Sequence, residues 1–198
     1  MNMQCFMVGH SNYQMDYFIN LLKSFKIDVV VDIRAVAYCN YAKWFDRENI
    51  EFEIKENSIK YIFMGDLLGA RYFDEDMLLD NGRVNFLEIQ KLSCYKEGFK
   101  RVVNGVKKRF RVAIMCAEKE PFDCHRTFLL SRDLQKEKIE PIHILEDGSF
   151  LTQRDIEKRL LSFYDLKKTL FDFDIDEALL IEKAYRLRNY DIGYLAKK

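Results

Sequence analysis

Residues 28–33 read DVVVDI, a run in which three consecutive valines stand between two carboxylates. A nearly continuous β-branched run of this length is typical of a strand buried on both faces, as strands of a parallel sheet are. Four other short apolar runs have a similar character: Cys5–Val8, Ile59–Met64, Arg111–Met115 and Pro141–Leu145. We therefore expect a sheet of five strands.

Helical patterns fill the gaps between these runs. Ser11 and Gln14 have the spacing of a capping box, which predicts a helix start after the first strand. Apolar stripes with helical periodicity follow at Phe18–Phe25 and Phe99–Phe110, and Cys124–Lys136 is a further candidate helix. Strands that alternate with helices predict a parallel sheet with right-handed crossovers. We expect a three-layer α/β domain over residues 1–150, with a mostly parallel, flavodoxin-like or Rossmann-like sheet.

Residues 151–198 have a different pattern. Thr152 with Asp155 indicates a capped helix start, and Asp176–Arg188 is predicted to be a second helix. We expect this part to be a helical C-terminal extension packed on the α/β domain. A separate module is the alternative.

The composition excludes several classes of protein. The chain has 32 basic and 32 acidic residues, so it is not a globally basic nucleic-acid binder. Only 8 glycines and 2 prolines argue against disorder. No apolar run approaches the ~18 residues that span a bilayer, and the start does not resemble a signal peptide. Five cysteines, an odd number, indicate reduced thiols in a cytoplasmic protein, without membrane association.

Most of the unusual polar residues follow the predicted strands. Ligands of an open parallel sheet bind outside the carboxyl ends of its strands, so we expect these residues to share one crevice. The groups are Gly9, His10 and Ser11; Asp32 and Arg34; Gly69 and Arg71; Cys116 and Glu118; and Cys124, His125 and Arg126.

Cys124 is the leading candidate for catalysis. It lies where a loop is predicted to become a helix, with Asp123 as the expected N-cap. A helix N-terminus favours a thiolate, and Arg126 and a protonated His125 would lower the pKa of the thiol further. A lowered pKa is what a nucleophilic cysteine needs. The alternative is a small buried hydrophobic residue in the first helical turn.

The remaining candidates each have a structural alternative. Cys116 is either a second thiol of the site or a core residue, and Glu118 is either a general acid or base or a solvated loop charge. His10 and His125 are candidates for proton transfer near neutral pH, whereas a purely local hydrogen bond is the alternative for His10. His143 lies within an apolar run and is expected to be a core histidine.

The arginines are candidates for binding an anion. Asp32 and Arg34 are two residues apart on a strand and point the same way, as a substrate-binding pair or as a structural ion pair. Gly69 and Arg71 combine a flexible turn with a planar donor that suits phosphate or carboxylate. Arg126 and the backbone at Gly9, His10 and Ser11 are expected to face the same anion.

Two alternatives involve other partners. Residues 96–111 contain seven Lys and Arg against the single Glu97, which is either the solvated face of a helix or a surface for nucleic-acid phosphates. A metal site built from Cys116, Cys124 and His10 or His125 is the third hypothesis, although seven intervening residues are not the spacing of a zinc ribbon. No cofactor is predicted for the leading hypothesis.

Several of these motifs resemble those of one family. Gly9-His10-Ser11-Asn12, Asp32-Ile33-Arg34 and Leu68-Gly69-Ala70-Arg71 come first, followed by Met115–Pro121, Cys124-His125-Arg126 and His143-Ile144-Leu145. In this order they resemble the bacterial and archaeal domain of unknown function 488 family, over roughly residues 4–150. The family usually has a second glycine at Ala70, and often Pro-x-Ser where this chain has residues 35–38. The resemblance implies no settled activity.

The leading hypothesis is an intracellular enzyme, a cysteine-dependent hydrolase or transferase. Its substrate is expected to be a small phosphorylated or otherwise anionic molecule. Cys124 would be the nucleophile or redox thiol, and Arg34, Arg71 and Arg126 would clamp the anion.

Overall fold

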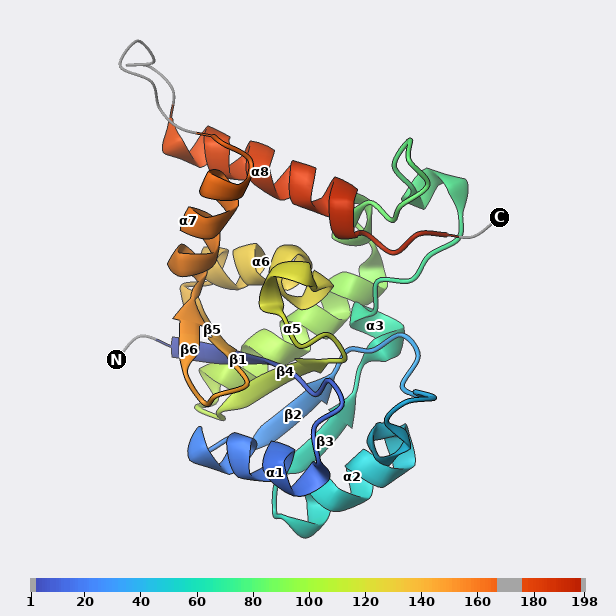
Figure 1. The fold of residues 1–198 in the computed structure, drawn as a ribbon, viewed down its shortest axis with the longest axis vertical. Coiled ribbons are helices and arrows are strands. Elements are labelled where there is room, and N and C mark those ends of the chain that lie inside the picture. The colour runs from blue at the N-terminus through green and yellow to red at the C-terminus, as the bar shows by residue number, and fades with distance from the viewer. Residues whose placement is uncertain (1–2, 167–175, 197–198) are drawn as a thin grey trace.

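A computed structural model describes residues 3–166 and 176–196 of the chain (Figure 1). A six-stranded sheet has the order β3-β2-β4-β1-β5-β6, and its first five members are parallel. The strands are β1 (Met3–Gly9), β2 (Val29–Asp32), β3 (Lys60–Phe63), β4 (Val112–Cys116), β5 (Ile139–Ile144) and β6 (Phe150–Thr152). The mostly parallel α/β fold is thus confirmed, and the order interchanges β1 and β4 relative to the 3-2-1-4-5-6 order of the Rossmann fold.

The sixth strand was not predicted. β6 pairs antiparallel with β5 through a tight turn at Asp147 and Gly148, where Gly148 has a positive φ of 79°. Three residues are too few to show an alternating pattern, but an Asp-Gly pair between two apolar segments is a recognised hairpin signal. This strand spans the boundary between residues 150 and 151, where the α/β domain is predicted to end and the helical extension to begin.

Helices cover both faces of the sheet, which is why its strands are apolar throughout (Figure 1). On one face lie α1 (Met15–Ser24) and α2 (Arg47–Glu56), whose buried residues pack with Phe6, Val8 and Val30. The other face carries α5, α6 and α7, which pack with Cys5, Met7 and Val31. The helices beyond α2 are α3 (Gly65–Leu68), α4 (Phe86–Ile89), α5 (Ser93–Lys107), α6 (Ser131–Lys136), α7 (Gln153–Phe163) and α8 (Glu177–Ile192).

The segment from residue 121 to residue 136 is not one continuous helix. A 3₁₀ turn (η3, Pro121–Asp123) is followed by extended Cys124, by a π-helical turn (η4, Arg126–Leu130) and then by α6. The predicted capping role of Asp123 is therefore wrong, because its carboxylate pairs with Arg188 of α8 instead. π-Helical turns often occur at functional sites.

The predicted capping box at Ser11 and Gln14 is also wrong. α1 begins at Met15, and Gln14 makes no side-chain capping hydrogen bond. Ser11 has a left-handed backbone with φ of 49°, and its N–H donates to the carbonyl of Ala117 (2.9 Å). The chain at Ser11 is thus held by the loop after β4 and cannot enter the helix.

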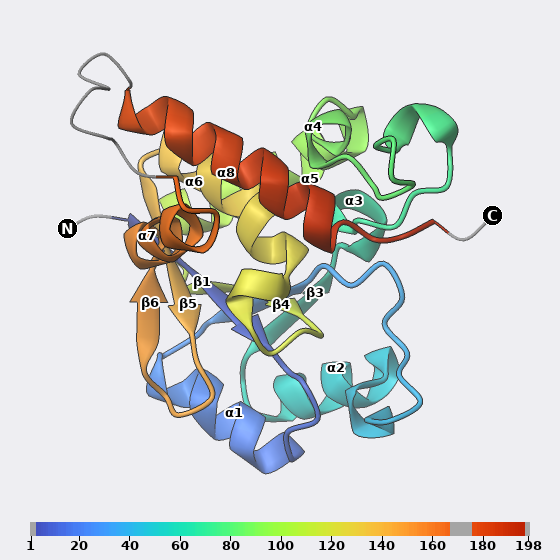
Figure 2. The same ribbon diagram turned by 45° about the horizontal axis from the view of Figure 1, so that its top comes forward.

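The C-terminal helices are tied into the domain. Thr152 and Asp155 form the predicted capping box at the start of α7. α8 runs along the outer side of the helical layer (Figures 1 and 2), and its Ala184 and Tyr185 belong to the main core cluster. The Asn189 side chain accepts from the Phe86 N–H and donates to the Val84 carbonyl, both at 2.8 Å. None of the described helices is long and apolar enough to cross a membrane.

Candidate functional site

The loop after β1 packs directly on the end of β4. The His10 N–H donates to the Cys116 carbonyl at 3.0 Å, beside the contact between Ser11 and Ala117. A Cβ on Gly9 would lie only 1.9 Å from the Glu118 carbonyl oxygen, so the close approach of the two loops requires glycine here. Gly9 and Ser11 therefore position the loop that carries Glu118.

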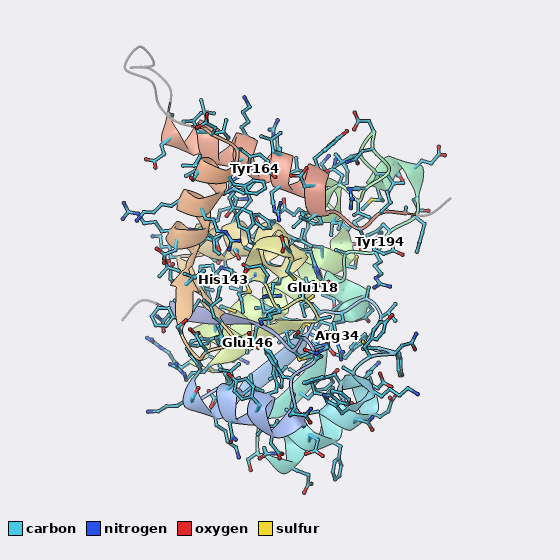
Figure 3. All side chains as sticks on the ribbon, in the orientation of Figure 1. Arg34, Glu118, His143, Glu146, Tyr164 and Tyr194 are labelled. Carbon is cyan, nitrogen blue, oxygen red and sulfur yellow. The ribbon has the colours of Figure 1, made fainter. Side chains whose placement is uncertain are left out.

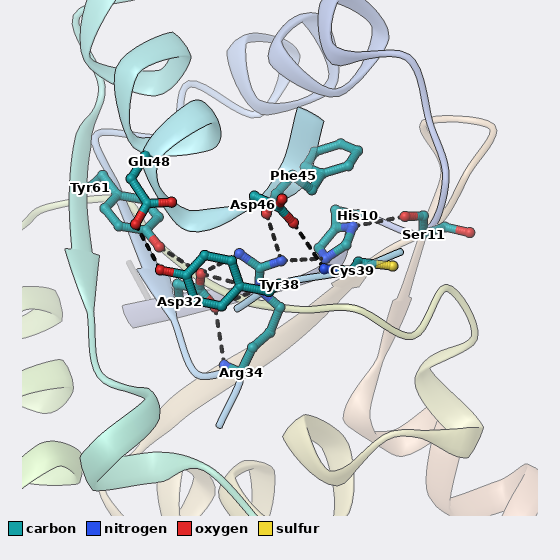
Figure 4. A network of polar contacts seen from close by, with 10 residues as sticks. All are labelled: His10, Ser11, Asp32, Arg34, Tyr38, Cys39, Phe45, Asp46, Glu48 and Tyr61. Carbon is teal, nitrogen blue, oxygen red and sulfur yellow. Dashed lines mark hydrogen bonds and ion pairs between the residues drawn. The ribbon is translucent and has the colours of Figure 1, made fainter. Parts of the chain in front are cut away.

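The Asp32 and Arg34 pair forms the centre of a buried polar network (Figure 4). Arg34 Nε and Nη2 donate to the Asp32 carboxylate at 2.7–3.1 Å, and the Tyr61 hydroxyl donates to the same carboxylate at 2.6 Å. Asp32 is fully buried and Arg34 is 4% exposed. Of the two predicted alternatives, these contacts correspond to the structural ion pair.

His10 belongs to this network through its side chain. Arg34 Nη1 lies 3.0 Å from His10 Nε2, and because arginine only donates, Nε2 accepts and Nδ1 carries the proton. Nδ1 then donates to the Ser11 carbonyl at 2.8 Å, and the ring stacks on Phe45 at 4.2 Å. Burial and the charge of Arg34 lower the pKa of His10 to about 4. The prediction that His10 transfers protons near neutral pH is therefore wrong, because both ring nitrogens are occupied.

Four other predicted residues meet at the end of β4. Glu118 Oε2 accepts from Cys116 Sγ at 2.7 Å and from Cys124 Sγ at 3.1 Å. His125 Nδ1 lies 3.6 Å from the sulfur of Cys116 and 3.9 Å from that of Cys124. We call Cys116, Glu118, Cys124 and His125 the thiol cluster.

The electrostatics of the thiol cluster differ from the prediction. Burial raises the pKa of Cys124 well above its usual value, and the hydrogen bond with Cys116 raises it further, whereas the charge of Arg126 opposes the shift. Glu118 is exposed, but its carboxyl group accepts from both thiols and loses part of its hydration, which opposes its ionisation. The neighbouring His125 and the two thiols nevertheless lower its pKa to about 2. Burial disfavours a charged His125, but Cys124 and Glu118 raise its pKa. The expected lowering of the Cys124 pKa is thus wrong.

Arg126 lies behind the thiol cluster and does not reach an anion in solvent. Its side chain is fully buried, with Nη1 donating to the Glu118 carbonyl (2.5 Å) and Nη2 to the Lys119 carbonyl (3.0 Å). Burial opposes its charge, but Cys124, Cys116 and Glu118 raise its pKa. The predicted role as a clamp is therefore wrong, and Arg126 holds the loop that carries Glu118.

A cavity of about 150 Å³ opens over the thiol cluster. Of the predicted residues, Arg34, Arg71, Cys116, Glu118 and His125 border it, whereas the fully buried Cys124 does not. In Figure 3 Arg34 and Glu118 are labelled next to one another, with Tyr194 above them, and all three border this cavity. The cavity lies where β1 leads to a helix on one face of the sheet and β4 leads to the other face, which is the expected place for a ligand.

Arg71 lies at the exposed rim of this cavity. Its guanidinium stacks over the ring of Tyr194 with 4.9 Å to the ring centre. Within the described part of the chain, this guanidinium has no hydrogen bond or ion pair. Gly69 does not border the cavity, because it packs tightly under the preceding turn, where a Cβ would lie 2.3 Å from the Gly65 carbonyl.

The C-terminal residues Ile192 and Tyr194 complete the cavity wall with Phe86 and Asp123. Asp123 is held by Arg188 of α8, which also donates to the Phe122 carbonyl at 3.0 Å. Sequence reasoning missed all of these residues. No local pattern signals them, because they meet the site through contacts between segments more than sixty residues apart.

Two other predictions concern residues away from the cavity. His143 is a core histidine as predicted, with Nε2 2.7 Å from Gln153 Oε1 and a pKa lowered by burial to about 4. The basic residues 96–111 lie on and after α5 and do not border the cavity, and Lys107 pairs with Glu137 at 2.6 Å. Nucleic-acid binding by this segment stays a prediction.

A larger groove of about 550 Å³ lies between α4, α6 and α8. It contains none of the residues predicted to carry chemistry, so its size does not make it the better candidate site. Charged residues of α6 and α8 line this groove, but the thiol, imidazole and carboxylate side chains that the sequence predicts to carry chemistry border the smaller cavity.

Fold and site together define a doubly wound α/β protein with a polar cavity at the carboxyl ends of its parallel strands. The chain belongs to the family described as Domain of unknown function DUF488, whose sequence profile matches residues 14–132. The match includes the whole thiol cluster, Arg34 and Arg71. Searches of the curated proteins and of the solved structures found no match.

Proposed function

We propose that this protein is an enzyme, of hydrolase or transferase type, that binds a small anionic or phosphorylated substrate in the cavity over the thiol cluster. One observation carries the proposal: arginine, carboxylate, imidazole and thiol side chains from separate strand ends border a single cavity. Such a convergence of polar groups in a cleft is the usual form of an active site.

The charges around the cavity favour an anion. Asp32 balances Arg34, Arg188 balances Asp123, and the imidazole of His125 faces Glu118. Of the two arginines that border the cavity, Arg71 is the one without a carboxylate partner among the described residues, and it stands exposed at the rim. An uncompensated arginine beside a cavity attracts phosphate or carboxylate, which its planar donors can bind through two hydrogen bonds.

The size of the cavity limits what it can enclose. About 150 Å³ is well below the roughly 300–1,000 Å³ of pockets that enclose a drug-sized ligand. The cavity therefore fits a small anion or the charged end of a larger substrate. Glu118 and His125 are the groups positioned to exchange protons with it.

Phosphate binding tests this proposal. Inorganic phosphate is titrated into the full chain and into Arg71→Ala, with binding measured by isothermal titration calorimetry. A charged hydrogen bond contributes roughly 1.5–3 kcal/mol, so the variant should bind about tenfold or more weakly. Arg101→Ala, which removes an exposed arginine of α5, is the matched control and should bind like the wild type. Absence of binding, or equal binding by Arg71→Ala, would overturn the proposal.

The cellular location belongs to the same proposal. All five cysteines are free, including the two neighbouring sulfurs of the thiol cluster. Unpaired thiols persist in a reducing compartment, which supports a cytoplasmic enzyme.

A further inference from the structure

The geometry points to a zinc site in which Cys116, Glu118, Cys124 and His125 are the ligands. The two sulfurs, one carboxylate oxygen and one ring nitrogen lie within 4.8 Å of one another. This inference goes beyond anion binding, because it assigns a metal centre to the floor of the cavity whether or not a substrate binds above it. In the metal-bound form Glu118 and His125 act as ligands instead of exchanging protons with the substrate.

The spacing of the ligand atoms agrees with a tetrahedral ion. Bonds of about 2.3 Å to sulfur and 2.0 Å to nitrogen place the two atoms about 3.5 Å apart in a tetrahedron. His125 Nδ1 lies 3.6 and 3.9 Å from the two sulfurs. The distances from Glu118 Oε2 to the sulfurs are shorter, 2.7 and 3.1 Å, because both thiols donate to it. When one ion replaces the protons of the two thiols, the exposed Glu118 side chain needs to shift outward only slightly.

The chemistry of the four ligands selects the metal. Two thiolates and an imidazole are ligands for zinc and other thiophilic ions, whereas magnesium and calcium require oxygen. The two cysteines are buried, and buried thiolates need a counter-charge. A tetrahedral site with mixed sulfur, nitrogen and oxygen ligands is most typical of Zn²⁺.

Arg126 provides an independent argument from charge. This arginine is fully buried, its guanidinium donates to two carbonyls, and within the described residues no carboxylate forms an ion pair with it. Two thiolates and the Glu118 carboxylate carry three negative charges, and Zn²⁺ with Arg126 carries three positive charges. The metal-bound cluster is therefore neutral as a whole, which gives the buried guanidinium its counter-charge.

The position of the cluster makes the ion accessible from one side. Cys116, Glu118 and His125 border the cavity, while Cys124 is fully buried and does not border it. Glu118 lies on an exposed loop and is the ligand that an incoming anion could displace. Catalytic zinc sites have such an exchangeable fourth position, and this last step rests on the proposed function.

Metal analysis of the full chain tests the inference. The protein is purified with a reductant and without chelator, then stripped and titrated with Zn²⁺ or Co²⁺. We expect one ion per chain and the spectrum of tetrahedral Co²⁺ with thiolate charge transfer. The double variant Cys116→Ser with Cys124→Ser should lose the bound ion and the thiolate charge-transfer spectrum. Its matched control, Cys39→Ser with Cys94→Ser, changes two other free cysteines and should retain the ion and the spectrum.

X-ray absorption at the zinc edge does not depend on how the variants fold. The wild-type spectrum should show two sulfur neighbours at about 2.3 Å and two lighter neighbours at about 2.0–2.2 Å. A chain without stoichiometric metal, an ion without sulfur neighbours, or undiminished metal in the double serine variant would overturn the zinc site.

The zinc site and the anion proposal fail separately. Arg71→Ala should bind phosphate about tenfold or more weakly and keep the ion, because Arg71 is not in the thiol cluster. Metal without phosphate binding in the wild type contradicts the proposed function alone. Phosphate binding in a chain that takes up no zinc contradicts the zinc site alone.

Discussion

Arg34 Nη1 donates to His10 Nε2 over 3.0 Å, and this contact joins the end of β2 to the loop after β1. Through it, the Asp32 and Arg34 pair fixes the loop that packs on Cys116 and Glu118. The polar network on one side of the strand ends therefore supports the thiol cluster on the other. The following predictions separate the supporting residues from those that would contact a ligand.

Removing the charge of Asp32 should destabilise the fold strongly. Asp32→Asn leaves the buried guanidinium of Arg34 without its counter-charge, and breaking a buried pair in this way costs about 3–5 kcal/mol. Urea unfolding of the variant and the wild type measures the decrease in the free energy of unfolding. Glu51→Gln removes the partner of Lys55 in an exposed helical pair and should cost less than about 1 kcal/mol. Equal effects of the two variants would show that the buried network adds no stability.

Stability should fall as the pH is lowered from about 6.5 to 4. His10 and His143 are buried in their neutral forms with pKa values of about 4, so the unfolded chain binds protons first in this range. Each histidine should cost about 3 kcal/mol by pH 4. The urea midpoint measured across this range tests the prediction. His143→Gln should reduce the dependence of the free energy of unfolding on pH. A stability that rises on acidification would contradict the burial of His10 and His143 in their neutral forms.

A side chain at residue 9 should separate the two loops of the site. Gly9→Ala places a Cβ 1.9 Å from the Glu118 carbonyl oxygen, so the backbone must move. We expect a large loss of stability and loss of phosphate binding. Gly148→Asn is the control, because its turn has open space and a positive φ that asparagine tolerates. Wild-type binding by Gly9→Ala would show that the loop contact does not position the site.

The link from the tail to the cavity can be tested at Arg188. Arg188→Met keeps much of the apolar stem over Phe122 but loses the bonds to the Phe122 carbonyl and to Asp123. Losing these charged hydrogen bonds should cost about 1.5–3 kcal/mol and weaken phosphate binding. Arg186→Met breaks an exposed helical ion pair with Glu182 and should change neither the free energy of unfolding nor the affinity for phosphate. Unfolding curves and phosphate titrations of both variants decide the matter.

Nucleic-acid binding by residues 96–111 requires an affinity that falls steeply as salt is added. Replacing Lys107, Lys108 and Arg109 by alanine should abolish any such affinity. A fluorescence anisotropy titration with a labelled oligonucleotide at low salt measures it. No binding at low salt would end this alternative.

Most of the fold followed from local patterns in the sequence. The valine run at residues 28–33 predicts a strand buried on both faces, and β2 has helices on either side. The rule that polar residues gather at the carboxyl ends of parallel strands brought Arg34, Arg71, Cys116, Glu118 and His125 to one cavity. These inferences succeeded because strand direction alone determines on which edge such residues lie.

The failures have a different physical origin. The sequence does not show that Cys124 is extended and enclosed, or that the carbonyls of the β4 loop take up the guanidinium of Arg126. Tyr194 and Ile192 reach the cavity through the packing of α8, which no local pattern encodes. Long-range packing thus decided which of the predicted side chains border the cavity.

A crystal structure of the full chain soaked with tungstate, a heavy-atom analogue of small oxyanions, tests the central claim most directly. The claim is that an anion binds between Arg71 and the thiol cluster. Anomalous density should appear in the cavity, within hydrogen-bond distance of the Arg71 guanidinium. Density confined to other surfaces, or a cavity without the ion at saturating tungstate, would contradict it.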